Sequence, residues 1–172
     1  FLVYSPDGAI VTNVDADHLD NYGTVEAYAE AFDEFVTTIA SFVVLNADDA
    51  GARTLAAAAR ERGLTVLTTG FAGDADLQAH ELVVDATSST FTVTRDGAEF
   101  GTVRRAVPGA HYAQDALLAL GAGLLLGHDF TPLAIGLAAY TGAARRMQLI
   151  GTAGGVRVYD SYAHHPTEVK VT

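Results

Sequence analysis

Two histidines stand side by side near the end of the sequence, in the stretch VYDSYAHHPTEV of residues 158–169. Neighbouring side chains on an extended segment point in opposite directions, so only one of His164 and His165 is expected to face a cleft. Pro166 restricts His165, the residue before it, to extended backbone. By themselves the two imidazoles suit a ligand site and a plain loop equally well.

A second polar group lies near the start, in NVDADHLDNYG of residues 13–23. It places Asp15, Asp17, His18 and Asp20 within six positions. Carboxylates beside a neutral imidazole form a ligand set for a hard divalent cation, although Mg²⁺ normally keeps several waters. The same residues also suit an acidic, solvated loop that leads into a helix, and spacing alone slightly favours that loop.

Two further stretches hold residues that bind anions in other proteins. Arg145 and Arg146 precede the last apolar run, and guanidinium groups hold phosphate or carboxylate with paired hydrogen bonds. Alternatively, Arg145 and Arg146 are ordinary surface side chains that bind no ligand. In PGAHYAQDALLAL, His111 is interpreted as the start of a buried helix rather than as a catalytic group. The motif G-x-x-x-x-G-K-[ST] is absent from this sequence, and with it the phosphate cradle of a P-loop ATPase.

The elements that would position these residues alternate between strand and helix over the first seventy residues. Strands are predicted at 9–14, 41–46 and 65–70, and helices at 25–39 and about 50–62. Thr24 is expected to cap the first helix, and Gly63 to end the second. This alternation is typical of a parallel sheet with crossover helices.

The second half of the chain has a different pattern. Alternating β-branched residues surround Asp96 and Gly97, which predicts a hairpin within a small antiparallel sheet. Helices follow at about 110–126 and 131–140, the latter with Thr131 as its cap and Pro132 in its first turn. A last, buried strand is predicted at 154–160. The fold class is therefore α/β, with a mostly parallel sheet, crossover helices and a small antiparallel sheet.

Ligands of α/β sheets gather at the carboxyl ends of the strands. The loop that contains His18 follows one predicted strand, and the loop from Asp160 to His165 follows another. We therefore expect these two loops to face one cleft.

The composition limits the classes of function. A net charge of −11 argues against a duplex-binding surface, which needs a basic stripe, but a single nucleotide needs only backbone N–H groups and a few cations. The longest apolar run, at 116–127, is too short to span a bilayer and predicts a buried helix. A chain without cysteine fits a cytoplasmic protein. Because Phe1 begins inside an apolar run, we expect a fragment.

Four motifs, taken in order, resemble the Mur ligases of peptidoglycan synthesis. TNVDADHLDNYG resembles the family's T-N-x-x-x-D-H-L-D signature, and PGAHYAQDALLA resembles its G-x-H-N-x-x-N-A-L-A helix start. YTGAARRMQLIG resembles the G-x-x-R-R-F/M-x-x-x-G segment, and VYDSYAHHPTEV the D-D-Y-G/A-H-H-P-T-E loop. The four span residues 12 to 169, and the last points within the family to an enzyme that adds L-alanine.

The resemblance implies that residues 1–172 are part of the family's central ATP-binding domain. The UDP-binding and amino-acid-binding domains, and the P-loop, would lie outside this chain, so we do not expect it to catalyse ligation alone. The implied reaction uses ATP and Mg²⁺ to join L-alanine to the carboxylate of UDP-N-acetylmuramate through an acyl phosphate.

The same resemblance assigns roles to individual residues. His18 would be a catalytic residue that binds Mg²⁺, and Arg146 would act on the nucleotide phosphates. The nucleotide is expected to contact Asp160, Arg146, Asp115 and His111. The substrate is expected to contact Tyr162, His164, His165 and Asn13.

The chain departs from the family pattern at Tyr112 and Asp115, where asparagine is usual, and at Ser161, where a second aspartate is frequent. A carboxylate accepts a hydrogen bond from an exocyclic amine but cannot donate one, so adenine recognition is expected to differ in detail.

Three alternative functions stay open. One is a sibling ligase that adds a recycled tripeptide, and another is a nucleotide-binding domain without catalysis. The third is a metal-dependent hydrolase that uses His18, His164 and nearby aspartates, which requires the histidines to share a metal ion.

Overall fold

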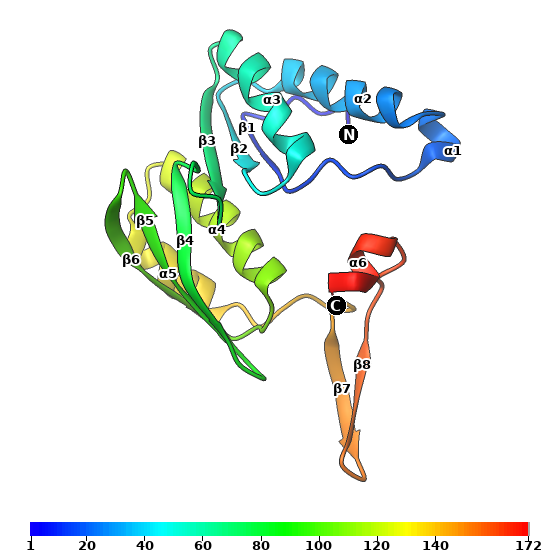
Figure 1. Ribbon diagram of the computed structural model, residues 1–172, viewed down its shortest axis with the longest axis vertical. Coiled ribbons are helices and arrows are strands. Elements are labelled where there is room, and N and C mark those ends of the chain that lie inside the picture. Colours follow the sequence, from blue (N-terminus) through cyan, green and yellow to red (C-terminus); the bar gives the residue numbers. More distant parts are fainter. Residues whose placement is uncertain (172) are drawn as a thin grey trace.

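A six-stranded sheet runs through the computed structural model, which describes residues 1–171 (Figure 1). Its strands follow chain order: β1 (Gly8–Val11), β2 (Phe42–Asn46), β3 (Thr65–Gly70), β4 (Leu77–Val84), β5 (Ser89–Arg95) and β6 (Ala98–Arg105). The strands from β1 to β4 pair in parallel, and those from β4 to β6 pair antiparallel. The α/β class predicted from the sequence is confirmed.

The antiparallel strands continue the parallel strands edge to edge. Leu77 of β4 pairs with Thr69 of β3, and β4 pairs along its other side with β5. The turn between β5 and β6 is the predicted one, because Asp96 and Gly97 have φ of 52° and 77°, as a two-residue hairpin turn requires. The two halves therefore form one surface for the helices.

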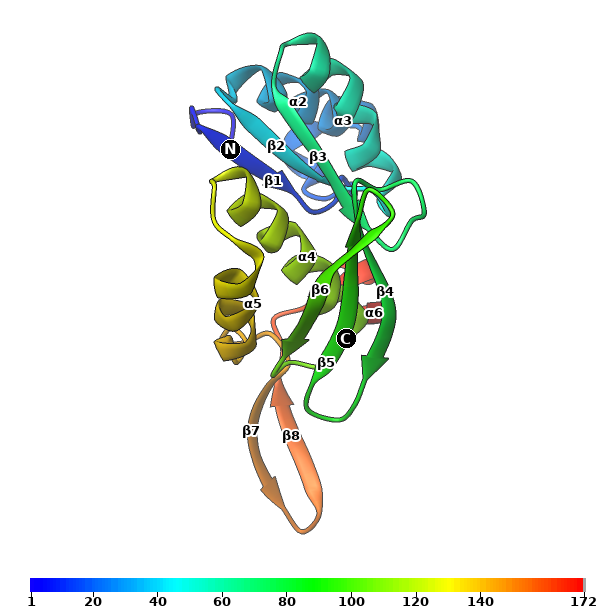
Figure 2. The same cartoon turned by 90° about the vertical axis from the view of Figure 1, so that its left-hand side faces the viewer.

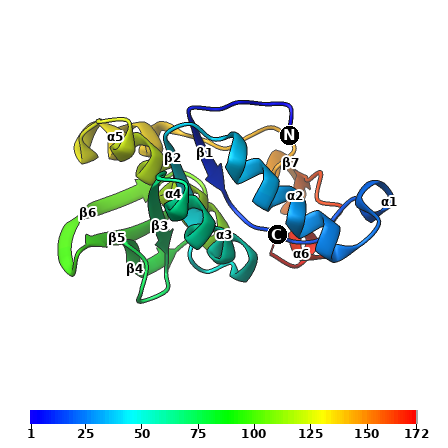
Figure 3. The ribbon, with the colours of Figure 1, turned by 90° about the horizontal axis from the view of Figure 1, so that it is seen from above.

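Helices cover both faces of this sheet (Figure 1 and Figure 3). The helices of the protein are α1 (Leu19–Tyr22), α2 (Val25–Thr38), α3 (Ala50–Glu61), α4 (Ala110–Leu125), α5 (Phe130–Ala139) and α6 (Pro166–Val171). Of these, α2 and α3 lie on one face of the sheet and α4 and α5 on the other. The helix α4 approaches the sheet so closely at Gly121 that an added Cβ would lie 3.0 Å from Leu67 and 3.2 Å from Val44. Within residues 1–171, no helix has the length and apolar character needed to cross a membrane.

Helix caps agree with the sequence for α2 and differ for α5. The Thr24 hydroxyl accepts a hydrogen bond from the Ala27 N–H at 3.1 Å, as predicted. The cap of α5 is Asp129, not Thr131, so the helix begins one residue before that threonine. Pro132 tolerates this shift because it still lies among the first helical residues, whose N–H groups have no partner within the helix.

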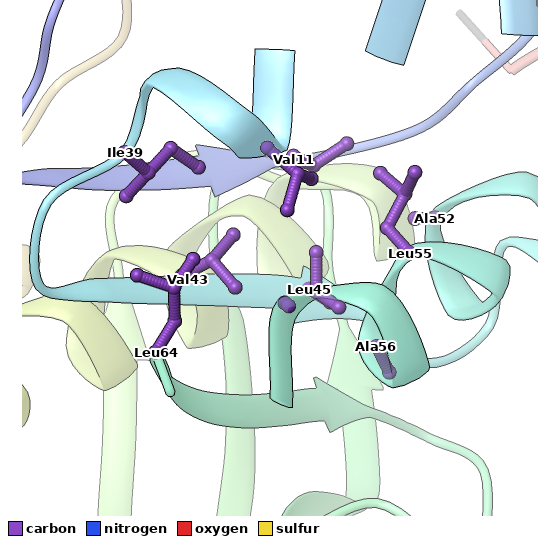
Figure 4. Close-up of a cluster of buried hydrophobic side chains, with 10 residues drawn as sticks. Val11, Ile39, Val43, Leu45, Ala52, Leu55, Ala56 and Leu64 are labelled. Carbon is purple, nitrogen blue, oxygen red and sulfur yellow. The ribbon is translucent and has the colours of Figure 1, made fainter. Parts of the chain in front are cut away.

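The apolar core beneath α2 and α3 follows the alternation of β2. Val43 and Leu45 are fully buried against Val36 and Leu55, as Figure 4 shows for part of the cluster. Val44 points to the opposite face, towards α4. Burial of each large side chain contributes about 1.5–3 kcal/mol, so the sheet is fixed from both sides.

The last predicted strand is not buried, which corrects the sequence analysis. It forms β8 (Val156–Asp160), which pairs antiparallel with β7 (Gln148–Ala153), a strand that was not predicted. This hairpin projects from the body of the protein (Figure 2), and every residue of β7 is exposed. Gly154 and Gly155, with φ of 56° and 80°, form its turn. An apolar strand is buried only when other elements pack against it, and the sequence pattern alone does not show whether they do.

Candidate active site

The two loops singled out from the sequence lie against each other. Thr167 Oγ1 donates to a carboxylate oxygen of Asp15 at 2.6 Å, and His165 Nδ1 lies 3.7 Å from the same oxygen. His165 Nε2 is 3.3 Å from the carbonyl oxygen of Ala16. The expectation that both loops face one cleft is confirmed. The reason for this proximity differs from the expected one, because the second loop does not follow a strand of the six-stranded sheet. It follows β8, and contacts of His165 and Thr167 with Asp15 hold it against the loop after β1. Figure 1 shows α6 beside that loop.

The two adjacent histidines differ in their surroundings. The side chain of His165 is 19% exposed and contacts the loop after β1, whereas that of His164 is 56% exposed. The His164 ring packs edge-on against Tyr162, with 5.1 Å between ring centres. One histidine of the pair therefore faces the cleft, as the alternation of side chains predicted.

A cavity of about 620 Å³ lies between these loops, the end of β2 and the start of α4. Five of the residues predicted for the site line it: Asn13, His111, Asp115, Arg146 and His165. The other four lie outside its lining: His18, Asp160, Tyr162 and His164. The structure thus brings together five predicted residues, at least one from each of the four motifs, around one cavity.

A polar network at the floor of the cavity was missed in the sequence. The Asn46 amide donates to the carbonyl oxygen of Thr12 at 2.8 Å, and its oxygen accepts from Gln114 at 2.8 Å. The Asp48 carboxylate accepts from Gln114 at 2.8 Å and from the N–H groups of Phe71 and Ala72 at 2.7 Å each. The signal was present, because Asn46 ends the strand at 41–46 and Asp48 and Asp49 follow it, at a carboxyl end of a strand where ligands gather.

Asp49 fixes the loop after β1 to the next helix. Its Oδ1 accepts from the Ala52 N–H at 2.7 Å, which caps α3, and from the Val14 N–H at 3.0 Å. One carboxylate therefore binds a free N–H group at the start of α3 and also holds the neighbouring loop beside the cavity.

The start of α4 forms the back wall. Gly109 has φ of +121°, and a Cβ there would lie 2.9 Å from the His111 ring, so glycine is required. Burial lowers the pKa of His111, whose Nε2 has no hydrogen-bond partner within residues 1–171. Burial raises the pKa of the Asp115 carboxyl, and the positive charges of His111, Arg105 and Arg146 oppose this shift.

Arg146 connects this wall to α6. Its Nη1 donates to Glu168 Oε1 at 3.1 Å, and Glu168 Oε2 accepts from the N–H groups of His164 and His165 at 3.1 and 3.4 Å. Those backbone bonds and Arg146 lower the pKa of Glu168 to about 2. The Glu168 side chain reaches back to the residue before α6, as in a capping box.

Arg145 holds the other predicted residues of this segment. Its Nε lies 3.8 Å from Asp160, and its guanidinium carbon lies 4.5 Å from the centre of the Tyr162 ring. The N–H of Tyr162 donates to the carbonyl oxygen of Arg145 at 2.8 Å. Asp160 and Tyr162 are thus fixed to the arginine pair, next to the cavity rather than in its lining.

His18 lies on exposed backbone at the start of α1, with its side chain 68% exposed and 3.5 Å from Asp17. Across the described part of the chain, no three His, Asp or Glu side chains are grouped to hold a metal ion. The hydrolase alternative needs such a group, so it loses its basis. A Mg²⁺ ion that is bound mainly by nucleotide phosphates and water needs only one or two protein ligands, so it does not require such a group.

Comparison with known proteins identifies the family. A model of the Mur ligase middle domain matches residues 2–123, which is most of the chain. The chain belongs to the Mur ligase family. A relative from Nocardioides sp. named UDP-N-acetylmuramate–L-alanine ligase is 49% identical over 171 residues, 98% of this chain and 33% of the relative. Other relatives of the same name are 42% to 47% identical.

Solved structures of Mur ligases have the same fold. The UDP-N-acetylmuramate–alanine ligase MurC of Thermotoga maritima aligns with a TM-score of 0.82 at 25% identity, over 99% of this chain and 38% of that one. MurF of Acinetobacter baumannii aligns with a TM-score of 0.84 over 97% of this chain and 36% of that one, at 22% identity. The chain spans about a third of the length of the relatives it matches.

Proposed function

We propose that this chain is the central part of a ligase that joins L-alanine to the carboxylate of UDP-N-acetylmuramate with ATP and Mg²⁺. The observation that carries the proposal is the contact of the D-S-Y-A-H-H-P-T-E loop with the D-A-D-H loop around one cavity. Relatives that match nearly the whole chain, with both loops, are named for this reaction. The lack of cysteine remains the reason to expect a cytoplasmic enzyme.

The chemistry needs an activated carboxylate, because a carboxylate is a poor electrophile and oxide is a poor leaving group. A carboxylate oxygen takes the terminal phosphoryl group of ATP, which gives an acyl phosphate and ADP. The amine of L-alanine then attacks the acyl carbon, and the C–O bond to phosphate breaks as the amide forms and a proton is lost. Catalysis consists mainly of positioning and charge neutralisation around the phosphoryl group.

The residues around the cavity are suited to that work. In the proposal, Arg146 holds a phosphate group, and its ion pair with Glu168 keeps the guanidinium at the cavity wall. His18 would supply a ligand to Mg²⁺, which when bound neutralises charge on the phosphoryl oxygens. Asp160, His111 and Asp115 would contact the nucleoside, and His165, His164, Tyr162 and Asn13 the substrate end.

Amine-dependent phosphate release by the full-length protein tests the proposal. With ATP, Mg²⁺ and UDP-N-acetylmuramate present, we expect release only after L-alanine is added. Release with a cell-wall tripeptide but not with L-alanine would assign the chain to the recycling sibling. No release with either amine would contradict a catalytic role and support the nucleotide-binding alternative.

A further inference from the structure

An arginine with almost no solvent exposure lies directly behind the cavity. Arg105, the last residue of β6, is 2% exposed. Its Nη1 donates to the carbonyl oxygen of Tyr112 in the first turn of α4. Its guanidinium carbon lies 5.6 Å from the ring centre of Tyr112 and 5.6 Å from that of Tyr140. Tyr112 and Tyr140 both line the cavity, so Arg105 supports its wall from inside the protein.

Burial of the Arg105 guanidinium costs free energy, and its hydrogen bond to Tyr112 offsets only part of that cost. The Nε of Arg105 has no hydrogen-bond partner among residues 1–171, and desolvation lowers the pKa of the group. Asp115 is the carboxylate that opposes this shift. An apolar side chain of similar volume would fill the position at lower cost, so packing alone does not explain an arginine here.

Both tyrosines adjoin the segment of residues 141–147, which contains Arg146. Tyr140 caps the end of α5, and residues 141–147 follow it directly. The Tyr112 hydroxyl donates to the carbonyl oxygen of Arg146 at 2.9 Å. Arg145 and Met147, on either side, have φ of 61° and 49°, in the left-handed region that non-glycine residues adopt only when their surroundings hold them there.

We propose that Arg105 is a positioning residue, which by holding Tyr112 and Tyr140 fixes segment 141–147 so that Arg146 faces the cavity. The consequence for catalysis rests on the proposed function, in which Arg146 acts on phosphate. The consequence for the segment itself does not, because it concerns only contacts within this chain.

Hydrogen exchange of the full-length protein tests the positioning step without any assay of ligation. Tyr112→Phe keeps the ring beneath Arg105 and removes only the hydroxyl, whereas Arg105→Met removes the charge. We expect both variants to speed exchange in residues 141–147 roughly 2- to 10-fold, the effect of one lost hydrogen bond on local opening. Exchange in β2 should stay unchanged, and Arg105→Lys should lie between native and Arg105→Met.

The kinetic readout is kcat/KM for ATP, which should fall in the same order of variants as exchange rises. Unchanged exchange in 141–147 for Tyr112→Phe would overturn the proposal, and that variant decides the matter if Arg105→Met does not fold. Equal acceleration in 141–147 and β2 would also overturn it, since that indicates a general loss of stability. Faster exchange confined to 141–147 in a protein with no alanine-dependent activity would refute the proposed function and leave the positioning role standing.

Discussion

At the scale of single residues, His18 is the predicted site residue with the most open position. Its backbone is left-handed, with φ of 52° and ψ of 39°, a region in which histidine and asparagine are enriched among non-glycine residues. The exposed imidazole adds little packing energy, so its replacement separates chemistry from stability.

We expect His18→Asn to lower alanine-dependent activity by about 10- to 100-fold, the usual cost of disturbing a metal site. Asparagine tolerates the left-handed backbone, so the unfolding temperature should change little. Activity measured against Mg²⁺ concentration checks this, with His128→Asn, at an exposed site between α4 and α5, as the control. Native activity in His18→Asn would remove this residue from the site.

Asp115 gives a prediction about pH. Its pKa is raised in the folded state, so the protonated carboxyl stabilises the fold, and this contribution is lost as pH rises through the folded pKa. Asp115→Asn should therefore raise the unfolding temperature at pH 7.5, with a smaller gain at pH values below the ordinary carboxyl pKa. ATP binding should be preserved or tightened if this side chain meets adenine, because an amide both donates and accepts.

Thermal unfolding at two pH values, with Asp33→Asn on the exposed side of α2 as the control, measures the effect. A lower unfolding temperature for Asp115→Asn at neutral pH would show that the carboxylate is needed, as the partner of buried Arg105.

At the scale of elements, α6 depends on its contacts. A six-residue helix is unstable alone, and Glu168 connects it to Arg146 and to the backbone before it. Because the pKa of Glu168 is lowered to about 2, this contribution is present above its ordinary value of 4.5 and is lost as pH falls through about 2.

Glu168→Gln should loosen residues 161–168 at neutral pH, with roughly 2- to 10-fold faster amide exchange from the weakened hydrogen bonds. Glu34→Gln, at an exposed position of α2, should have no such effect. Exchange in 161–168 that is unchanged by Glu168→Gln would show that the contact between Thr167 and Asp15 holds α6 by itself.

Two helix caps provide a matched pair. Thr24 accepts from one N–H, whereas Asp49 accepts from its helix and from Val14 of the neighbouring loop. Thr24→Ala should cost about 1 kcal/mol in the free energy of unfolding, and Asp49→Ala should cost about 2 kcal/mol or more. Urea unfolding compares them, and equal costs would contradict the role of Asp49 in holding the loop after β1.

Elements with strong local signals were predictable, and those set by tertiary contacts were not. The Thr24 cap of α2, the end of α3 at Gly63 and the Asp96–Gly97 turn are set by local sequence, so each was found where expected. The apolar residues of β8 read as a buried strand, but they form an exposed hairpin with β7 because no other element covers them. The packing of α6 depends on partners far away in the sequence.

At the scale of the whole molecule, the site was predictable in composition but not in geometry. The resemblance selected residues from four motifs, and the fold places five of them in one cavity. Arg105 and Gln114 were missed because their importance comes from burial and long-range hydrogen bonds, whereas Asn46 had a sequence signal at the end of a strand.

The most direct measurement is the product formed by the full-length protein from ATP, Mg²⁺, UDP-N-acetylmuramate and an equal mixture of L-alanine and cell-wall tripeptide. Mass spectrometry of the UDP-linked product decides between the amines in one reaction. We predict a product heavier by one alanyl residue, formed together with ADP and phosphate. A product that carries the tripeptide, or an unchanged UDP-sugar after ATP has been supplied, would contradict this prediction.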